Sequence, residues 1–271
     1  MSLPEIAVLL FVTYILGYFL YIIYYALGLY HVNPLVKLKR LTAQEKLLII
    51  QSFPVYTKFS ALQKQKFELR LIRFRNRKQF MFHGLVPQQE QMVLLICTTA
   101  IMLTMGVKGY MISSIDRIII YPTHYFSRIN RQSHIGEYNP RLKTLVLSAE
   151  HFRAGFDSLD DNLNLGLHEF AHALSFNALS KRSREAQTFT MGLEKIQQLH
   201  FDVHFLAQLN STAYFREYGM ENIHEFFAVA VENYVETPAT FQKEFPVLYG
   251  IIGQMLNFDF QRPISRIKNS V

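Results

Sequence analysis

The sequence predicts an α+β protein, built from one N-terminal transmembrane helix and a helix-rich domain that contains a small β-sheet. Three observations lead to this prediction. Residues 6–30 form an uncharged apolar segment long enough to cross a membrane. Most later segments carry helical hydrophobic patterns, whereas only residues 117–121 and 143–147 are short and rich in β-branched residues. An order of helices, a small sheet and further helices is typical of the α+β class.

Residues 6–30 are expected to form a single transmembrane helix. The segment carries no charged side chain, and it exceeds the roughly 20 residues that a helix needs to cross the hydrocarbon core. The alternative, a cleaved signal peptide, would need a basic region before a shorter apolar core. No Lys or Arg precedes Lys37, so we expect a retained anchor and assign residues 1–35 to it.

The charges that flank this segment predict its orientation. The N-terminal side offers only the amino group and Glu5, whereas basic residues follow on the C-terminal side: Lys37, Lys39, Arg40 and Lys46. Positively charged flanks stay in the cytoplasm, so the rest of the chain is expected at the inner face of the cell membrane. The single cysteine, Cys97, rules out an intramolecular disulfide, which agrees with a reducing compartment.

Residues 36–271 are expected to form one domain, because about 235 residues are enough for a single hydrophobic core. The 23 phenylalanines, without any tryptophan, predict a core rich in aromatic rings. The net charge of +7 is unevenly distributed, and residues 64–78 are strongly basic. This stretch is interpreted either as a contact with anionic lipid headgroups or as a solvated helix face. Direct nucleic-acid binding is not expected, because no recognisable motif accompanies the charge.

The first half of this domain is expected to be helical. Hydrophobic patterns predict helices over residues 41–53, 60–77 and 88–105, and Pro54 separates the first two. The last of them is apolar over residues 92–105, which is too short for a membrane span and favours a buried core helix. Strands are predicted at residues 117–121 and 143–147, before two long helices.

The motif His168-Glu169-Phe170-Ala171-His172 is an H-E-x-x-H sequence inside a segment with helical character. Histidines four residues apart project from the same face of a helix. His168 and His172 can therefore bind one zinc ion together. Glu169 is then placed to act as general base on a zinc-activated water.

The surroundings of the motif favour this interpretation over a chance occurrence. Apolar residues leave little of the helix polar and predict that it is buried: Leu165, Leu167, Phe170, Ala171, Leu174 and Phe176. Without a metal, burial would leave two imidazoles and a carboxylate in an apolar setting, which is costly. Asp160 or Asp161 is expected to cap the start of this helix.

A catalytic zinc ion needs a third protein ligand and leaves its fourth position to water. The metzincin form of the motif requires Gly and His where this chain has Ser175 and Ala178. We therefore expect a glutamate from a second helix. Five candidates lie downstream: Glu217, Glu221, Glu225, Glu232 and Glu236.

Glu225 is the favoured third ligand. It lies in a helix predicted over residues 222–236, for which Asn222 is a suitable N-cap. Glu225 also stands three residues after Asn222, where the glutamate of a capping box would stand, and this alternative remains open. A second pair with the same spacing, His200 and His204, has no glutamate beside its first histidine and is expected to be a satisfied or exposed pair.

Two segments resemble a known family. Residues 167–174 (L-H-E-F-A-H-A-L) and residues 218–229 (Y-x6-E-F-F-A-V) are similar to the zinc peptidase family of Mlc titration factor A (MtfA). The resemblance extends over about residues 41–244 and includes the pair Gly136-Glu137. This family belongs to the gluzincins, and its catalytic core is also similar to that of anthrax lethal factor. The membrane segment and Ala173, where the family pattern has lysine, depart from the resemblance.

By this resemblance, residues 36–271 form a gluzincin-like metallopeptidase domain. His168, His172 and Glu225 match the metal ligands, which implies Zn²⁺ as cofactor. Glu169 matches the general base. Tyr218, seven residues before Glu225, matches the tyrosine that donates a hydrogen bond to the developing oxyanion.

These inferences lead to a membrane-anchored zinc metallopeptidase that hydrolyses a peptide or protein in the cytoplasm. Leu145, Val146 and Leu147 are expected to lie on a sheet edge that faces the metal cleft and pairs with an extended substrate. The alternative function, motivated by the resemblance, is a regulatory protein that binds a transcription repressor and has weak or vestigial peptidase activity. A purely structural zinc site would need a fourth protein ligand, whereas the motifs supply three.

Overall fold

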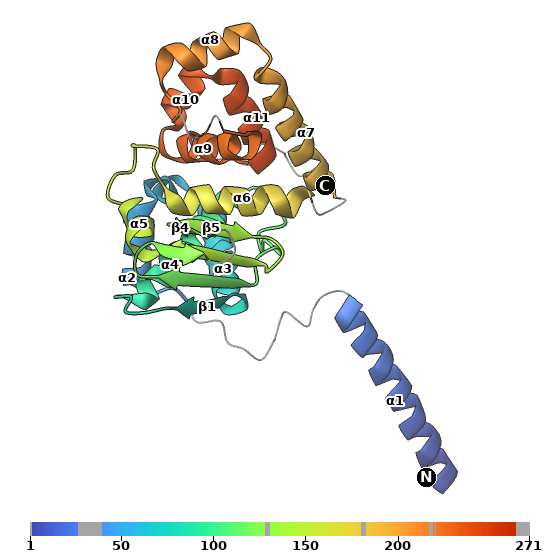
Figure 1. The fold of residues 1–271 in the computed structure, drawn as a ribbon. Helices are drawn as coiled ribbons and strands as arrows, with labels where there is room; N and C mark the ends of the chain where they lie inside the picture. The colour runs from blue at the N-terminus through green and yellow to red at the C-terminus, as the bar shows by residue number, and fades with distance from the viewer. Residues whose placement is uncertain are drawn as a thin grey trace. The chain divides into compact units, whose positions relative to one another are not determined.

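The computed structural model of the chain describes residues 2–26, 40–127, 131–179, 183–216, 219 and 221–263. The chain forms two compact units, Met1–Lys39 and Arg40–Val271. Helices dominate the described residues of both units, and the strands described lie in the second (Figure 1). The α+β class predicted from the sequence is therefore confirmed.

The first unit contains helix α1 (Leu3–Ala26). Within it, residues Leu3–Tyr24 form a helix of 22 residues that is long and apolar enough to cross a membrane. At about 1.5 Å per residue this length matches a hydrocarbon core of about 30 Å. Large apolar side chains point to solvent all around the helix, among them Phe11 and Phe19. A helix that is apolar on every face suits a lipid environment.

The second unit begins with helices α2 (Ala43–Ser52), α3 (Ala61–Arg77) and α4 (Gln89–Leu103), with the short 3-10 helix η2 (Pro54–Lys58) after α2. The strands are β1 (Gln79–Phe82), β2 (Arg117–Tyr121), β3 (Tyr125–Ser127), β4 (Gln132–His134), β5 (Gly136–Asn139) and β6 (Thr144–Ser148). The later helices are α5 (Ala149–Ala154), α6 (Leu165–Leu179), α7 (Arg184–Leu199), α8 (Val203–Thr212), α9 (Ile223–Glu236), α10 (Pro238–Glu244) and α11 (Pro246–Leu256).

Local sequence signals explain where the first helices begin. Thr42 and Ser60 are the N-caps of α2 and α3, and each takes part in a capping box with the residue three positions later, Glu45 or Gln63. Each box satisfies two backbone amides that a helix start leaves without partners. The predicted helices over residues 41–53, 60–77 and 88–105 are confirmed to within two residues at each end.

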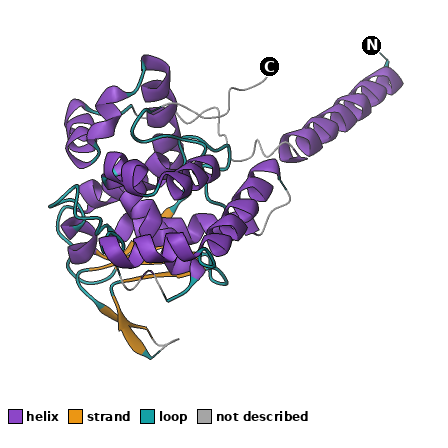
Figure 2. Ribbon diagram, turned by 90° about the horizontal axis from the view of Figure 1, so that it is seen from above, coloured by secondary structure: helices purple, strands orange, loops and turns teal. Residues whose placement is uncertain are grey.

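Four strands form the main sheet, in the order β1-β2-β6-β5. β1, β2 and β6 are parallel, and β5 is antiparallel to β6. Ile118, Ile120, Leu145 and Leu147 are fully buried on one face of this sheet. The hairpin of β3 and β4 forms a separate two-stranded sheet and extends away from the helices (Figure 2).

The position of β6 contradicts one expectation from the sequence. Leu145, Val146 and Leu147 lie on an internal strand, with β2 on one side and β5 on the other. Their backbone groups are therefore used within the sheet. The strand at this edge is β5, which the strand prediction did not include.

The basic residues of α3 have a structural role that neither interpretation of this stretch anticipated. Lys66 Nζ donates a hydrogen bond to the carbonyl of Met105 (2.9 Å), and Arg70 Nη1 donates one to the carbonyl of Thr104 (2.7 Å). The buried Lys78 Nζ donates to the carbonyl of Ile112 (3.1 Å). Lys66 and Arg70 thus bind carbonyls that directly follow the last residue of α4, where positive charge complements the negative end of the helix dipole.

Helix α6 lies between the sheet and the C-terminal helices (Figure 1). It contacts β5 and β6 on one side, and α9 and α7 on the other. Leu167, Phe170 and Ala171 on this helix are fully buried. On α9, every residue from Phe226 to Tyr234 is buried. These two helices carry the H-E-x-x-H motif and the favoured third ligand, so the candidate site is held by the core of the domain.

Candidate metal centre

The start of α6 is fixed by Asn164. Its Oδ1 accepts a hydrogen bond from the amide of Leu167 (3.0 Å), and its carbonyl accepts one from the amide of His168 (3.0 Å). The expectation that Asp160 or Asp161 caps this helix is wrong. Asp161 Oδ1 accepts from the amide of Leu163 (3.0 Å) and shapes the preceding loop instead. The first histidine thus lies one turn inside a buried helix.

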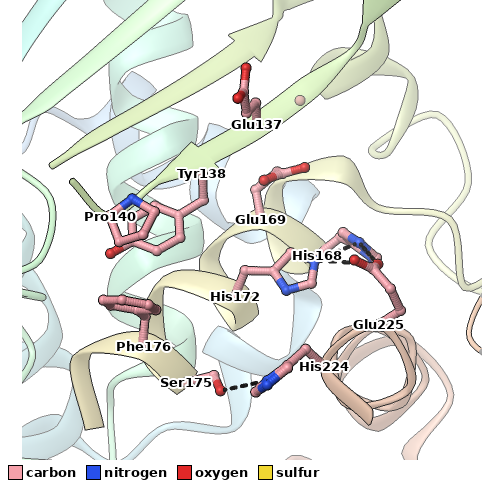
Figure 3. Close-up of a pocket in the computed structure, with 11 residues that line it drawn as sticks. Glu137, Tyr138, Pro140, His168, Glu169, His172, Ser175, Phe176, His224 and Glu225 are labelled. Atoms are coloured by element: carbon pink, nitrogen blue, oxygen red, sulfur yellow. Dashed lines mark hydrogen bonds and ion pairs between the residues drawn. The ribbon is translucent and has the colours of Figure 1, made fainter. Parts of the chain in front are cut away.

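His168, His172 and Glu225 converge on one point (Figure 3). The Nε2 atoms of the two histidines are 3.1 Å apart. Glu225 Oε2 lies 3.1 Å from Nε2 of His168 and 3.4 Å from Nε2 of His172. Residues from two helices, more than fifty positions apart in the chain, therefore present two nitrogens and one oxygen to a common centre.

These three residues fit a zinc ion. Ligands that lie about 2.0–2.1 Å from a tetrahedral ion are separated from one another by about 3.3–3.4 Å, which is close to all three observed distances. Imidazole nitrogen and carboxylate oxygen are ligands that zinc accepts, and three protein ligands leave one position for water. Among the described residues, these three side chains form the group of potential ligands that lie close enough together to share a metal ion.

The side chain of Glu225 does not form a capping box. Asn222 is the N-cap of α9, and its Oδ1 accepts hydrogen bonds from the amides of His224 (2.9 Å) and Glu225 (3.1 Å). The carboxylate of Glu225 contacts both histidines rather than the Asn222 amide. The amide of Glu225 therefore serves the cap while its side chain serves the candidate centre.

The contacts among these side chains shift their pKa values. Burial lowers the pKa of His168, but hydrogen bonds with Glu225 and Glu232 outweigh burial and raise it to about 9. Burial raises the pKa of Glu225, but its contacts with His168 and His172 outweigh burial and hold it well below its usual range. Both shifts follow from how closely the three side chains approach one another.

Glu169 lies beside the three candidate ligands, close to strand β5. Burial raises the pKa of Glu169 to about 7, the range in which a carboxylate works well as a general base. Gly136 on β5 leaves room for this side chain, because a Cβ atom there would stand 2.6 Å from Glu169 Oε1 and 2.6 Å from Leu165 Cδ1. Steric crowding therefore explains why the first residue of the Gly136-Glu137 pair is a glycine.

Two cavities meet at this centre. One has a volume of about 430 Å³ and is lined by Tyr138, Phe176 and His224, together with the candidate ligands. The other has a volume of about 620 Å³, lies toward the start of α6 and includes Arg216. Gly136, His168 and Glu169 line both, so these three residues stand where the halves of the cleft join.

Glu232 contacts Nδ1 of His168, the ring nitrogen that does not face the candidate centre. Its Oε2 lies 3.2 Å from His168 Nδ1 and also accepts a hydrogen bond from Arg216. Its Oε1 accepts a hydrogen bond from the amide of Asn164 (2.8 Å). The sequence had offered Glu232 as a candidate ligand. Its spacing of seven residues from Glu225 places both on one helix face, but it meets the other ring nitrogen of His168.

The other candidates from the sequence are not part of the described group. Tyr218 and Glu217 are outside the described residues, so the role expected for Tyr218 stays a prediction. Glu221 and Glu236 are not part of the group formed by the described candidate ligands. His200 is a satisfied side chain, because its Nδ1 lies 2.9 Å from the carbonyl of Ile196 and its ring packs against Phe226.

The chain is similar to a known protein family and to an uncharacterized relative. The family model described as glucose-regulated metallo-peptidase M90 matches residues 31–256. An uncharacterized protein of Synechocystis sp. is 25% identical over 220 residues, which cover 73% of this chain and 78% of the relative. The matched region contains the sheet, α6 and α9, and thus every described residue of the candidate centre.

Proposed function

We propose that this chain, which belongs to the glucose-regulated metallopeptidase family M90, is a membrane-anchored, zinc-dependent peptidase. The observation that carries the proposal is the convergence of His168, His172 and Glu225 beside the buried Glu169, in a cleft on the domain surface. Three ligands with one open position, and a carboxylate next to it, form the arrangement that hydrolysis by an activated water requires.

Each residue has a separate task in this proposal. His168, His172 and Glu225 would hold the ion, which when bound supplies a Lewis acid for the scissile carbonyl and lowers the pKa of water. Glu169 takes a proton from the attacking water. It then passes that proton to the leaving amine as the peptide bond breaks.

Tyr218 is proposed to donate a hydrogen bond to the oxyanion that develops on the scissile carbonyl. A donor of this kind contributes a few kcal/mol in comparable sites. Its place in the sequence supports the assignment, because Tyr218 stands seven residues before Glu225, as in the family pattern.

Strand β5 is the edge on which an extended peptide would bind. In the described part of the chain, β5 pairs with β6 and ends the sheet. The amide of Ser148 donates to the carbonyl of Ile135 (2.7 Å), so alternate residues counted from Ile135 pair with β6. Gly136 and Tyr138 then direct their backbone groups to the opposite side, where a substrate backbone can pair with them.

The proposed location is the cell membrane, with the peptidase domain in the cytoplasm. Support comes from α1, which is long and apolar enough to span a bilayer. The basic residues that follow it, including Lys37 and Arg40, favour a cytoplasmic position for the second unit. The substrate would then be a cytoplasmic peptide or protein.

Repressor binding with vestigial catalysis is the alternative function. The MtfA resemblance motivates it, and the candidate ligands and Glu169 would then serve binding rather than turnover. A retained general base argues against this alternative, because a binding protein has no need of a carboxylate poised beside the open metal position.

The proposal is tested by comparing wild-type protein with Glu169→Gln, both loaded with zinc and verified to hold equal amounts. Cleavage of a peptide library is followed by mass spectrometry, with Glu194→Gln on the exposed face of α7 as matched control. Loss of the general base should lower the rate by about 10²–10⁴-fold. Equal rates would contradict the role of Glu169, and no cleavage by the wild type would favour the binding alternative.

A further inference from the structure

Phe176 is an exception on a buried helix. Its side chain is 47% exposed, whereas Leu167, Phe170 and Ala173 on the same helix are fully buried. It follows His172 by four residues, so it lies one turn further along the same face. Phe176 also lines the cavity of about 430 Å³ beside the candidate centre. An apolar ring exposed inside a cleft is typical of a ligand contact.

We infer that this half of the cleft is a subsite for an apolar side chain, aromatic or branched aliphatic, of the peptide substrate. The inference rests on the proposed function and names its specificity. The side chain would belong to a residue within two positions of the scissile bond, on its N-terminal side.

The wall beside Phe176 is also apolar. The rings of Tyr138 and Phe176 are 6.1 Å apart, in an edge-to-face arrangement, and Pro140 lines the cavity beside them (Figure 3). The hydroxyl of Tyr138 donates a hydrogen bond to the carbonyl of Ser114 (3.3 Å). Tyr138 therefore presents its ring, and not its hydroxyl, to a bound side chain.

Polar groups at this end of the cleft disfavour other occupants. Ser175 Oγ lies 3.4 Å from His224 Nδ1, so these two groups pair with each other. Glu137 and Glu169 also line this cavity. Neither is assigned to the metal ion, so their negative charge would disfavour an acidic substrate side chain. Apolar rings with acidic neighbours leave an uncharged, apolar residue as the best fit, with a basic residue as the competing outcome.

Strand direction places the subsite on the N-terminal side of the cleaved bond. Glu169 lies against Gly136, so the reacting bond is expected near that end of β5. Tyr138 is two residues, about 7 Å, further along the strand. Antiparallel pairing is slightly more stable than parallel pairing. In a peptide antiparallel to β5, the residues beside Tyr138 therefore lie on the N-terminal side of the residues beside Gly136.

The test uses the full chain in detergent, loaded with zinc, and a synthetic peptide library. Cleavage sites of the wild type should be enriched in Phe, Tyr, Leu or Ile on the N-terminal side of the bond. Two peptides that differ only in having Phe or Ala at this position are then compared. Phe176→Ser should lower the preference for the Phe peptide over the Ala peptide, measured as the ratio of their kcat/KM values, by about tenfold. Phe201→Ser is the control, because Phe201 is 80% exposed and lines neither cavity of the cleft.

The outcomes separate the inference from the proposed function. Cleavage without a preference, a preference for Lys or Arg, or an apolar preference on the C-terminal side would each overturn the subsite while leaving the peptidase intact. An unchanged preference in Phe176→Ser would do the same. Failure of the zinc-loaded wild type to cleave any library peptide would overturn the proposed function, and the subsite with it.

Discussion

At the scale of single residues, His168 is held from both sides. Its Nε2 faces Glu225 and its Nδ1 faces Glu232. With Nδ1 directed to a carboxylate, the ring is turned so that Nε2 points at the candidate centre. Arg216 and the amide of Asn164 hold Glu232 in turn. Supporting contacts of this kind orient a ligand and raise its basicity.

Glu232→Gln should therefore weaken zinc binding by about 10–100-fold. The amide preserves the size of the side chain but removes the charge that faces His168 and Arg216. Competition with a chromophoric chelator measures the affinity, and circular dichroism checks that the variant is folded. An affinity equal to that of the wild type would show that Glu232 does not position His168.

Glu225→Ala and Tyr218→Phe should differ in their effects. Removal of the Glu225 carboxylate should abolish stoichiometric zinc binding and activity together, because one of three protein ligands is lost. Tyr218→Phe should keep full zinc content and lower kcat, because its hydrogen bond forms chiefly in the transition state. A folded Glu225→Ala protein with unchanged zinc affinity, or a Tyr218→Phe protein with unchanged kcat, would contradict the assigned role.

Sequence patterns predicted much of the candidate site. The spacing of His168 and His172 predicted their convergence, because a helix fixes the geometry of residues four apart. The prediction of Glu225 as a ligand required a second motif, because the distance of Glu225 from the two histidines depends on how α6 and α9 pack together. The role of Glu232 was not predicted, because sequence spacing does not reveal which nitrogen of an imidazole a distant carboxylate meets.

At the scale of elements, helices were more predictable than strands. Helix starts at Thr42 and Ser60 depend on local hydrogen bonds that adjacent residues supply. Strand order depends on contacts between distant segments. The strand predicted over residues 143–147 corresponds to β6 (Thr144–Ser148), but its place between β2 and β5 did not follow from its sequence. The short strand β5, with Gly136 and Asn139 at its ends, has weak β-propensity and was not predicted.

The contact between β5 and α6 makes Gly136 a sensitive position. In Gly136→Ala, the new methyl group would meet Glu169 Oε1 and Leu165 Cδ1 at 2.6 Å unless these side chains move. Displacement of the general base by a fraction of an ångström to 1 Å should lower kcat by about 10–100-fold. Zinc affinity should be unchanged, because the atoms nearest to this methyl group belong to Glu169 and Leu165 and not to the three candidate ligands.

Gly250→Ala on α11 is the matched control, because no atom lies within 4 Å of its Cβ position. This variant should keep wild-type kcat and gain up to about 1 kcal/mol in the free energy of unfolding, as expected for alanine in a helix. A Gly136→Ala protein with wild-type kcat would show that Glu169 does not depend on this contact.

At the scale of the whole molecule, the chain combines a family domain with an apolar N-terminal helix, which we propose to be a membrane anchor. The family match begins at residue 31, after the helix Leu3–Ala26. The anchor would restrict the peptidase to substrates that approach the membrane. The cytoplasmic orientation proposed for the domain depends on the basic residues that follow the helix, among them Lys37, Lys39 and Arg40.

Reporter fusions after Val271 test this orientation. A fluorescent protein that matures in the cytoplasm should be active there, and alkaline phosphatase, which needs an oxidising compartment, should be inactive. Replacement of Lys37, Lys39 and Arg40 by Gln should weaken the bias, since the positive flank sets the orientation. Full phosphatase activity in the unaltered chain would place the domain on the other side of the membrane.

The position of the metal tests the proposed site most directly. Diffraction data from zinc-loaded crystals, collected on both sides of the zinc absorption edge, locate the ion without assumptions about its ligands. We expect one anomalous peak in the cleft, about 2.0–2.2 Å from the nearest atoms of His168, His172 and Glu225. Glu232 should contact Nδ1 of His168 and should not bind the ion. A peak bound by Glu232 in place of Glu225, or no peak at the two histidines, would contradict the proposed centre.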